Sequence, residues 1–197
     1  MSLIQAIKHY FVSTAIRRAR GQKTAHSSML INVSQYIKKQ DDVYRLVNAQ
    51  VIECCDQIDC LDDNPAFEKD LESIFLEKIT HSNSIICQMY PEWSDRLDMP
   101  LWTNVREELR FVAAKVRNEV RVIHSSTDDD FDLNTTRLDY NKYENREKEI
   151  DNGLYVIAIG GNTMARGITL EGLVVSYFFR TSNTFDTLMQ MGRWFGY

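Results

Sequence analysis

The sequence contains no long apolar run. Among its 197 residues, no stretch approaches the roughly 18 consecutive apolar residues that span a bilayer. The opening Met1-Ser2-Leu3-Ile4 does not begin a signal peptide, because no long apolar stretch follows a basic start. We therefore expect a cytoplasmic protein with no membrane partner. A hydrophobic fraction of 44% and a charged fraction of 26% are typical of a globular chain, which at this length buries a core without disulfides or metals.

Groups of metal ligands are also lacking. The chain has four cysteines, but they do not form the two spaced pairs of a zinc site. Its four histidines show no ligand spacing either. We predict no metal site in this chain and interpret the cysteines as small buried side chains in a reducing compartment. The residues concerned are Cys54, Cys55, Cys60, Cys87, His9, His26, His81 and His124.

Acidic residues are absent from positions 1–40, although the net charge of the whole chain is −5. The charged residues of this region are Lys8, Arg17, Arg18, Arg20, Lys23, Lys38 and Lys39. Such asymmetry indicates one of two arrangements. The basic residues form a surface that meets phosphate, or they lie on a helix packed against the acidic middle of the same chain. The sequence leaves both open.

The spacing of apolar residues predicts an α/β fold. Strands are expected at 29–33, 119–124, 154–159 and 173–179, the last two as continuous apolar runs covered on both faces. Helices are expected at 3–20 (with Gly21 as the stop), 35–56, 66–80, 101–116 and from 184 onward. Strands alternating with helices favour a doubly wound parallel sheet flanked by helices. We predict one domain over 1–197, with a helical insertion at 61–110.

Small and polar residues follow the expected strand at 154–159. Residues 160–173 read GGNTMARGITLEGL and stand at the carboxyl end of that strand, where open α/β sheets bind ligands. Glycines there let backbone N–H groups approach a phosphate. Thr163 and Thr169 offer hydroxyls, and Arg166 offers a charged fork. The alternative is a strand-to-loop connection with incidental glycines.

A second such segment follows the next strand. Residues 187–197 read TLMQMGRWFGY, in which Gly192 stands between Gln190 and Arg193 and leaves the arginine room to approach an oxyanion. A guanidinium directed at a terminal phosphate accelerates phosphoryl transfer by orders of magnitude. The alternative for Arg193 is a surface salt bridge.

Together the two segments resemble motifs five and six of superfamily-two helicases, where an Arg-Gly turn after one strand is followed by a Gly-Arg helix after the next. The sequences ARGITLEGL at 165–173 and QMGRWFGY at 190–197 are most similar to those of the Z1 domain family. That family accompanies helicase-type ATPase modules and is described as a group of proposed endonucleases. The resemblance implies a second RecA-like lobe that is a fragment of a longer protein, with 29–34 near motif four.

The resemblance also implies roles for particular residues. Arg193 would act catalytically on the terminal phosphates of the nucleotide, beside Gln190. Three departures from the family pattern stand out: Thr169 replaces an acidic residue, Gly161 replaces a threonine, and Gly196 replaces a second arginine. The implied nucleotide-binding residues are Gly167, Thr169 and Gly192, and the implied nucleic-acid-binding residues are Gly161, Thr163 and Arg166.

Two elements of an ATPase are missing from the sequence. It has no G-x-x-x-x-G-K-[ST] loop and no Asp-Glu pair after a strand, which would hold phosphates and magnesium. ATP and Mg²⁺ are therefore expected only together with a first RecA-like lobe of the same protein, which we predict as a partner beside nucleic acid, DNA foremost. A non-catalytic interaction or scaffold domain is the alternative. A third hypothesis is a stand-alone nuclease using Asp128, Asp129, Asp130 and Asp132.

Overall fold

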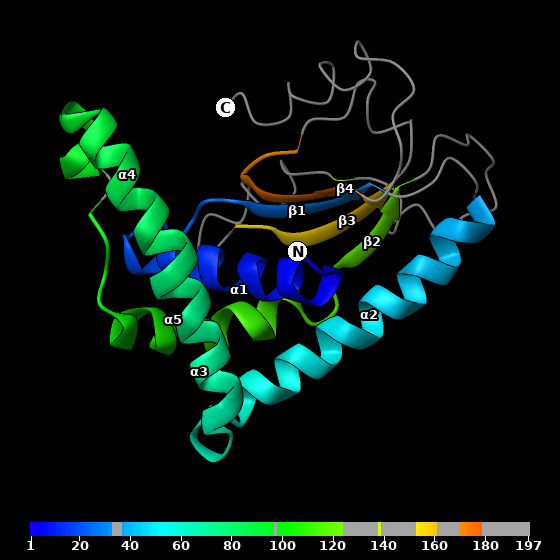
Figure 1. The fold of residues 1–197 in the computed structure, drawn as a ribbon. Coiled ribbons are helices and arrows are strands. Elements are labelled where there is room, and N and C mark those ends of the chain that lie inside the picture. Colours follow the sequence, from blue (N-terminus) through cyan, green and yellow to red (C-terminus); the bar gives the residue numbers. More distant parts are fainter. Residues whose placement is uncertain (33–36, 97, 124–137, 139–152, 161–169, 179–197) are drawn as a thin grey trace, which may run out of the picture. The chain divides into compact units, whose positions relative to one another are not determined.

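The computed structural model describes residues 1–32, 37–96, 98–123, 138, 153–160 and 170–178 (Figure 1). The chain divides into a helical unit, residues 1–23 and 52–115, and a sheet unit, residues 24–51 and 116–197. The predicted α/β class with a parallel sheet is confirmed, and the sheet is consistent with a RecA-like arrangement. The predicted insertion at 61–110 falls in the helical unit together with residues 1–23. Its status as an insertion in a single lobe stays a prediction.

Helix α1 (Leu3–Ala19) opens the helical unit. The Ser2 hydroxyl accepts a hydrogen bond from the Gln5 N–H at 3.2 Å, and the Gln5 side chain accepts one from the Ser2 N–H at 3.0 Å. This capping box satisfies amides that the first turn of a helix otherwise leaves free. The helix ends before Gly21, whose φ of 88° is accessible to glycine at little cost. The predicted stop at Gly21 is therefore confirmed.

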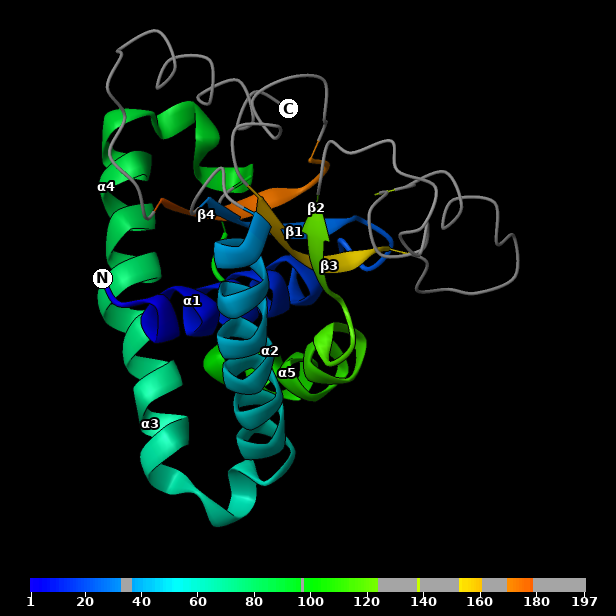
Figure 2. The same ribbon diagram turned by 90° about the vertical axis from the view of Figure 1, so that its right-hand side faces the viewer.

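The longest helical stretch of this unit continues without a break through three elements (Figure 2): α3 (Pro65–Ser73), the π-helical η2 (Ile74–Thr80) and α4 (His81–Met89). The sequence predicts an end at Thr80, and this prediction is wrong. Neither glycine nor proline interrupts the chain between Thr80 and Pro91. Pro91 disfavours helical backbone at the residue before it, and the helix ends one residue earlier still, at Met89.

The other helices complete the unit and connect it to the sheet. Helix α2 begins in the sheet unit and ends in the helical unit. Its last residue is Asp59, three residues after the predicted end at Asp56. Helix α5 agrees with the expected range of 101–116. The bounds are α2 (Ile37–Asp59), η1 (Leu61–Asp63), η3 (Pro91–Arg96) and α5 (Trp102–Val116).

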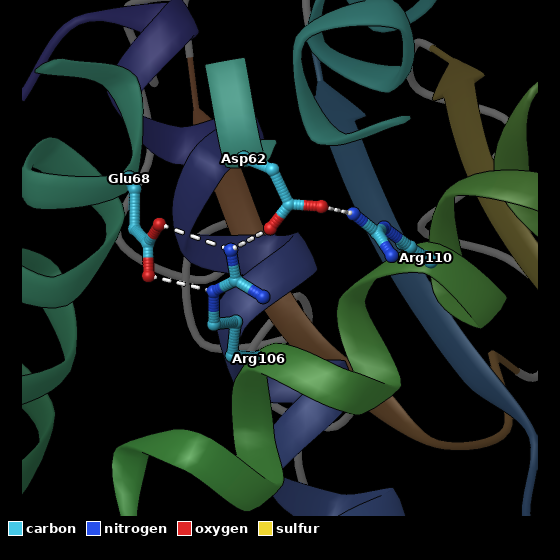
Figure 3. Close-up of polar contacts among 4 residues, drawn as sticks. All are labelled: Asp62, Glu68, Arg106 and Arg110. Atoms are coloured by element: carbon cyan, nitrogen blue, oxygen red, sulfur yellow. Dashed lines mark hydrogen bonds and ion pairs between the residues drawn. The ribbon is translucent and has the colours of Figure 1, made fainter. Parts of the chain in front are cut away.

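An ion-pair network links η1 and α3 to α5 (Figure 3). The Arg106 guanidinium donates to Glu68 at 2.7 Å and to Asp62 at 2.6 Å, and Arg110 donates to the second oxygen of Asp62. Hydrogen bonds from Arg106 and then Arg110 hold the pKa of Asp62 below its ordinary value. Because Asp62 faces water, we assign the network to fixing the position of η1 rather than to a large stabilisation.

The sheet unit contains four parallel strands in the order β2-β3-β1-β4 (Figure 1). All four overlap the ranges expected from the sequence. Their parallel pairing agrees with strands separated by long connections, since antiparallel neighbours need only a short turn. The bounds are β1 (Ser27–Asn32), β2 (Val120–Ile123), β3 (Tyr155–Gly160) and β4 (Leu173–Phe178).

One core cluster of the sheet unit lies on the face of the sheet to which Leu30 belongs, which we call the Leu30 face. Leu30, Ile123, Ala158 and Leu170 form a buried cluster there, with Leu173 and Phe178 packed against it. Strands β1 and β3 are buried along their whole length, whereas every residue of β4 is only half-buried. The expectation that β4 is covered on both faces is wrong, because β4 lies at one end of the strand order.

Candidate functional site

The predicted site residues follow two described strands. Strand β3 ends at Gly160, the first residue of segment 160–173, and β4 ends at Phe178, before segment 187–197. Both strands are neighbours of β1 and run parallel to it. The two segments therefore leave the sheet from the same edge. The predicted residues themselves lie outside the described part of the chain: Gly161, Thr163, Arg166, Gly167, Thr169, Gln190, Gly192 and Arg193.

The carboxyl ends of the four strands form a single row. Ile123 of β2 pairs with Gly160 of β3. Gly160 pairs with Asn32 of β1, and Asn32 pairs with Phe178 of β4. Each of these residues is the last of its strand. We call this row the carboxyl edge; it carries one polar side chain, Asn32, between a glycine and an aromatic residue.

The carboxyl edge contains a topological switch point between β1 and β3. The chain leaving β1 goes to β2, on one side of this pair, whereas the chain leaving β3 goes to β4, on the other side. In open α/β sheets, ligands bind in the crevice outside the carboxyl ends of adjacent strands whose connections diverge in this way. The topology thus selects Asn32 and Gly160, which are paired at this point, as the centre of the candidate site.

The buried side chain of Asn32 makes no hydrogen bond with the residues that the structure describes. Its side chain has no solvent exposure, and within the described part of the chain neither its amide nitrogen nor its amide oxygen has a partner. A carboxamide carries two donors and an acceptor, and leaving such groups buried and unpaired costs about 1–3 kcal/mol. Because folding alone selects against this state, Asn32 is the feature of the sheet unit that most needs a functional explanation.

Two residues of segment 160–173 are anchored at strand β1 or its core cluster. Gly160, the first residue of the segment, pairs with Asn32 in the sheet. Leu170 is fully buried in the cluster with Leu30 and Ala158. Residues two apart on a strand share a face, so Asn32 belongs to the Leu30 face as well. Leu170, which lies in the part that resembles motif five, therefore packs on the face of the sheet to which the unpaired amide belongs.

The opposite, amino edge of the sheet is closed by hydrogen bonds. The Ser28 hydroxyl donates to the Glu171 carbonyl at 2.8 Å, and the Leu154 N–H donates to Nδ1 of His26 at 2.9 Å. The Ser27 N–H donates to the Leu154 carbonyl at 2.9 Å. A Cβ atom on Gly153 would lie 2.4 Å from the Ala25 carbonyl oxygen. Side-chain and main-chain groups at this edge are used in holding the strands together and do not offer a site.

The basic residues of α1 face acidic residues of the same unit. Lys8 forms an ion pair with Asp70 at 2.5 Å, and Arg18 forms one with Glu108 at 2.7 Å. Arg18 also lies over the Phe111 ring, with its guanidinium carbon 3.5 Å from the centroid. Of the two arrangements that the sequence left open, the structure favours a helix packed against acidic residues of the same chain. The side chains of Lys38 and Lys39 lie outside this description.

The four cysteines form no disulfide with one another. All four are free thiols, and Cys54 and Cys55 are buried. Burial raises the pKa of the Cys54 thiol to about 12, which leaves it protonated and unreactive at neutral pH. Among the described residues, no three His, Cys, Asp or Glu side chains gather in a way that would hold a metal ion. Asp128, Asp129, Asp130 and Asp132 lie outside those residues.

Asn32 is not among the site residues that the sequence predicts. One signal for it was present: Asn32 is the only polar residue of the apolar run at 29–33, which reads MLINV. A polar side chain at the end of a buried strand is a candidate binding group. What the sequence could not show is that its amide has no partner in the fold.

One comparison with known proteins gives a match. The family model described as the Z1 domain matches residues 2–197, which is nearly the whole chain. No curated protein and no solved structure matches it. Among the described helices, none is both long and apolar enough to cross a membrane.

Proposed function

We propose that this chain, which belongs to the Z1 domain family, is the second motor lobe of a helicase-like ATPase that acts on nucleic acid. In this proposal it completes an ATP site whose phosphate loop and magnesium ligands come from a first RecA-like lobe. The observation that carries the proposal is the carboxyl edge. The two segments that resemble motifs five and six follow β3 and β4, which lie on either side of β1 and end at the same edge of the sheet.

The proposed roles follow the chemistry of the residues. Arg193 would stabilise the charge that develops on the transferred phosphoryl group, with Gln190 beside it in the cleft. Gly167, Thr169 and Gly192 would contact the nucleotide through close backbone approach and a hydroxyl. The nucleic-acid backbone would be contacted by Gly161, Thr163 and Arg166.

The carboxyl edge fits a nucleotide better than it fits a magnesium ion. The row that ends the strands consists of Ile123, Gly160, Asn32 and Phe178 and contains no carboxylate, whereas magnesium in ATPase sites is held by hydroxyl and carboxylate oxygens. Asn32 supplies hydrogen-bonding groups that suit an organic ligand. This supports the part of the proposal in which magnesium is bound by the first lobe.

Nucleic-acid cleavage is a weaker proposal for this chain. It rests on the resemblance and on the acidic run at 128–132, which lies outside the described residues. Loss of metal-dependent nicking in Asp128→Ala and Asp130→Ala would support it.

A non-catalytic interaction domain is the second candidate. The pairing of Lys8 with Asp70 and of Arg18 with Glu108 favours it, because these cations are neutralised within the chain and are not offered to phosphate. In that case the family fold would serve as a scaffold, and the carboxyl edge would bind no nucleotide.

ATPase activity of the full-length protein, measured with and without DNA, tests the proposal. We expect DNA-stimulated hydrolysis that falls about 10³-fold or more in Arg193→Ala, the usual effect of removing an arginine from a phosphoryl-transfer site. Arg45→Ala, which removes an exposed arginine from α2, is the matched control and should retain wild-type activity. Activity that ignores Arg193 would remove its catalytic role, and no activity at all would favour the scaffold.

A further inference from the structure

The unpaired amide of Asn32 specifies what kind of group would satisfy it. A phosphate only accepts hydrogen bonds and would pair with the amide nitrogen alone, while a metal ion would take the amide oxygen alone. Because both atoms lack a partner among the described residues, the complementary group both donates and accepts. In a nucleotide, such groups are found in the nucleoside part: the sugar hydroxyls and the edge of the base.

The neighbours of Asn32 in the row agree with this chemistry. Gly160 on one side has no side chain, so β3 places nothing beyond its backbone beside the amide in that row. Phe178 on the other side is aromatic and half-buried, and aromatic rings beside a polar group are common partners of nucleobases. No charged residue is present in the row, so Asn32 is its one polar side chain.

We propose that Asn32 is a ligand-binding residue whose carboxamide recognises the nucleoside part of a nucleotide bound at the switch point between β1 and β3. The inference rests on the proposed function for the presence of a nucleotide at this edge, and it adds the group that is recognised and the residue that recognises it. Since the amide is shielded from water, its hydrogen bonds discriminate strongly against a ligand that lacks the matching groups.

The test replaces Asn32 in the full-length protein and follows stability and binding separately. Asn32→Leu keeps the branching of the side chain but removes both polar atoms. Without ligand we expect its melting temperature to equal or exceed that of the wild type, because an unpaired buried amide has been removed. Its affinity for ADP should fall about tenfold or more, the effect of losing one paired hydrogen-bonding edge. Affinity for tripolyphosphate, which has no nucleoside, should not change.

Two further variants keep the test decisive. Ser28→Ala lies on the same strand and the same face but removes a hydroxyl that is already hydrogen-bonded, so it should lower the melting temperature and leave ADP binding intact. Asn32→Asp retains the shape of the side chain but replaces the donating NH2 group with a second acceptor oxygen and, when ionised, adds a negative charge, so it should weaken ADP binding.

The outcomes separate this inference from the proposed function. A wild-type protein that binds neither ADP nor ATP would overturn the proposed function and this inference together. Wild-type binding that persists unchanged in both Asn32 variants would overturn the inference alone. A marked fall in the melting temperature of both Asn32 variants with ADP binding retained would also overturn it, because the amide would then be satisfied by a buried water or by the chain itself.

Discussion

The two edges of the same parallel sheet are built in opposite ways. At the amino edge, Ser28 is buried and its hydroxyl is hydrogen-bonded to the Glu171 carbonyl. At the carboxyl edge, Asn32 is equally buried and its amide has no partner among the described residues. The two residues lie on the same strand and on the same face, but near opposite ends of that strand. The amino edge satisfies its polar groups and the carboxyl edge leaves them available.

This difference separates the part of the sheet that holds the fold together from the part that offers a site. Buried polar groups in a stable fold are paired, and the exceptions concentrate where a ligand completes the pairing. The dense contacts at Gly153 and His26 fix the starts of β1 and β3. The same two strands end side by side at the carboxyl edge, where Asn32 pairs with Gly160. Two residues that are far apart in the sequence are therefore neighbours there.

Truncating Leu30, in the core cluster of the sheet unit, should have the largest effect on stability. Leu30→Ala opens a cavity in the fully buried cluster on the Leu30 face, and we expect unfolding free energy to fall by about 2–5 kcal/mol. Urea denaturation measures this change. Leu46→Ala is the matched control, since Leu46 is 66% exposed on α2, and it should have little effect. Equal losses in the two variants would contradict the position of Leu30 in the core.

A side chain at Gly153 should break the amino edge alone. Its Cβ atom would lie 2.4 Å from the Ala25 carbonyl oxygen and 2.9 Å from the carbonyl carbon, so main chain has to move. We expect Gly153→Ala to lower the unfolding free energy by about 1–3 kcal/mol, as for other overpacked sites. Gly21→Ala is the control for backbone strain. Gly21 has a positive φ but open space around it, so an added Cβ atom strains the backbone there without a steric clash. A Gly153→Ala variant as stable as wild type would show that the edge is not tightly closed.

Loss of the Ser28 hydroxyl should have a smaller effect of the same sign. Ser28→Ala leaves the Glu171 carbonyl without this donor, and a typical hydrogen bond contributes about 0.5–1.5 kcal/mol. Ser94 makes a similar bond to the Pro91 carbonyl at an exposed position, so Ser94→Ala should change stability by less. Asn32→Leu removes a polar group from the same face of the same strand. We expect Ser28→Ala to destabilise the protein and Asn32→Leu not to, because of the two groups only the Ser28 hydroxyl is hydrogen-bonded among the described residues.

The Glu171 carboxylate should contribute least. It lies 3.7 Å from Nε2 of His26 and is 43% exposed, and the edge uses the Glu171 carbonyl rather than its side chain. We expect Glu171→Gln to change unfolding free energy by less than about 0.5 kcal/mol, as for most exposed positions. A loss comparable to that of Ser28→Ala would mean that the carboxylate takes part in closing the amino edge.

The secondary structure was largely predictable from the sequence because it depends on local patterns. The strand at 154–159 reads as a continuous apolar run, and Tyr155–Gly160 is buried throughout. Gly21 marked the end of the first helix correctly. The failure at Thr80 has a local cause too: the helix continues because no glycine or proline opposes it up to Met89.

The candidate site was predictable only in part. The glycines and the arginine of the segment after β3 could be recognised, since their residue types carry the chemistry. Asn32 could not be, because whether an amide is paired depends on groups that are far away in the chain. The same holds for the pairing of Lys8 with Asp70 and of Arg18 with Glu108, where charge alone allowed either partner.

What the sequence determined by itself is therefore the α/β class, most of its strands and helices, and the segments in which phosphate chemistry is expected, since each follows from residue type and short spacing. Only the tertiary structure decided the order β2-β3-β1-β4, which places β1 between the strands that precede the two segments. It also decided that the Ser28 hydroxyl is hydrogen-bonded, whereas the Asn32 amide finds no partner in the described part of the chain. The physical reason is that a hydrogen bond needs a partner at a given point in space, and strand order fixes which residues reach that point.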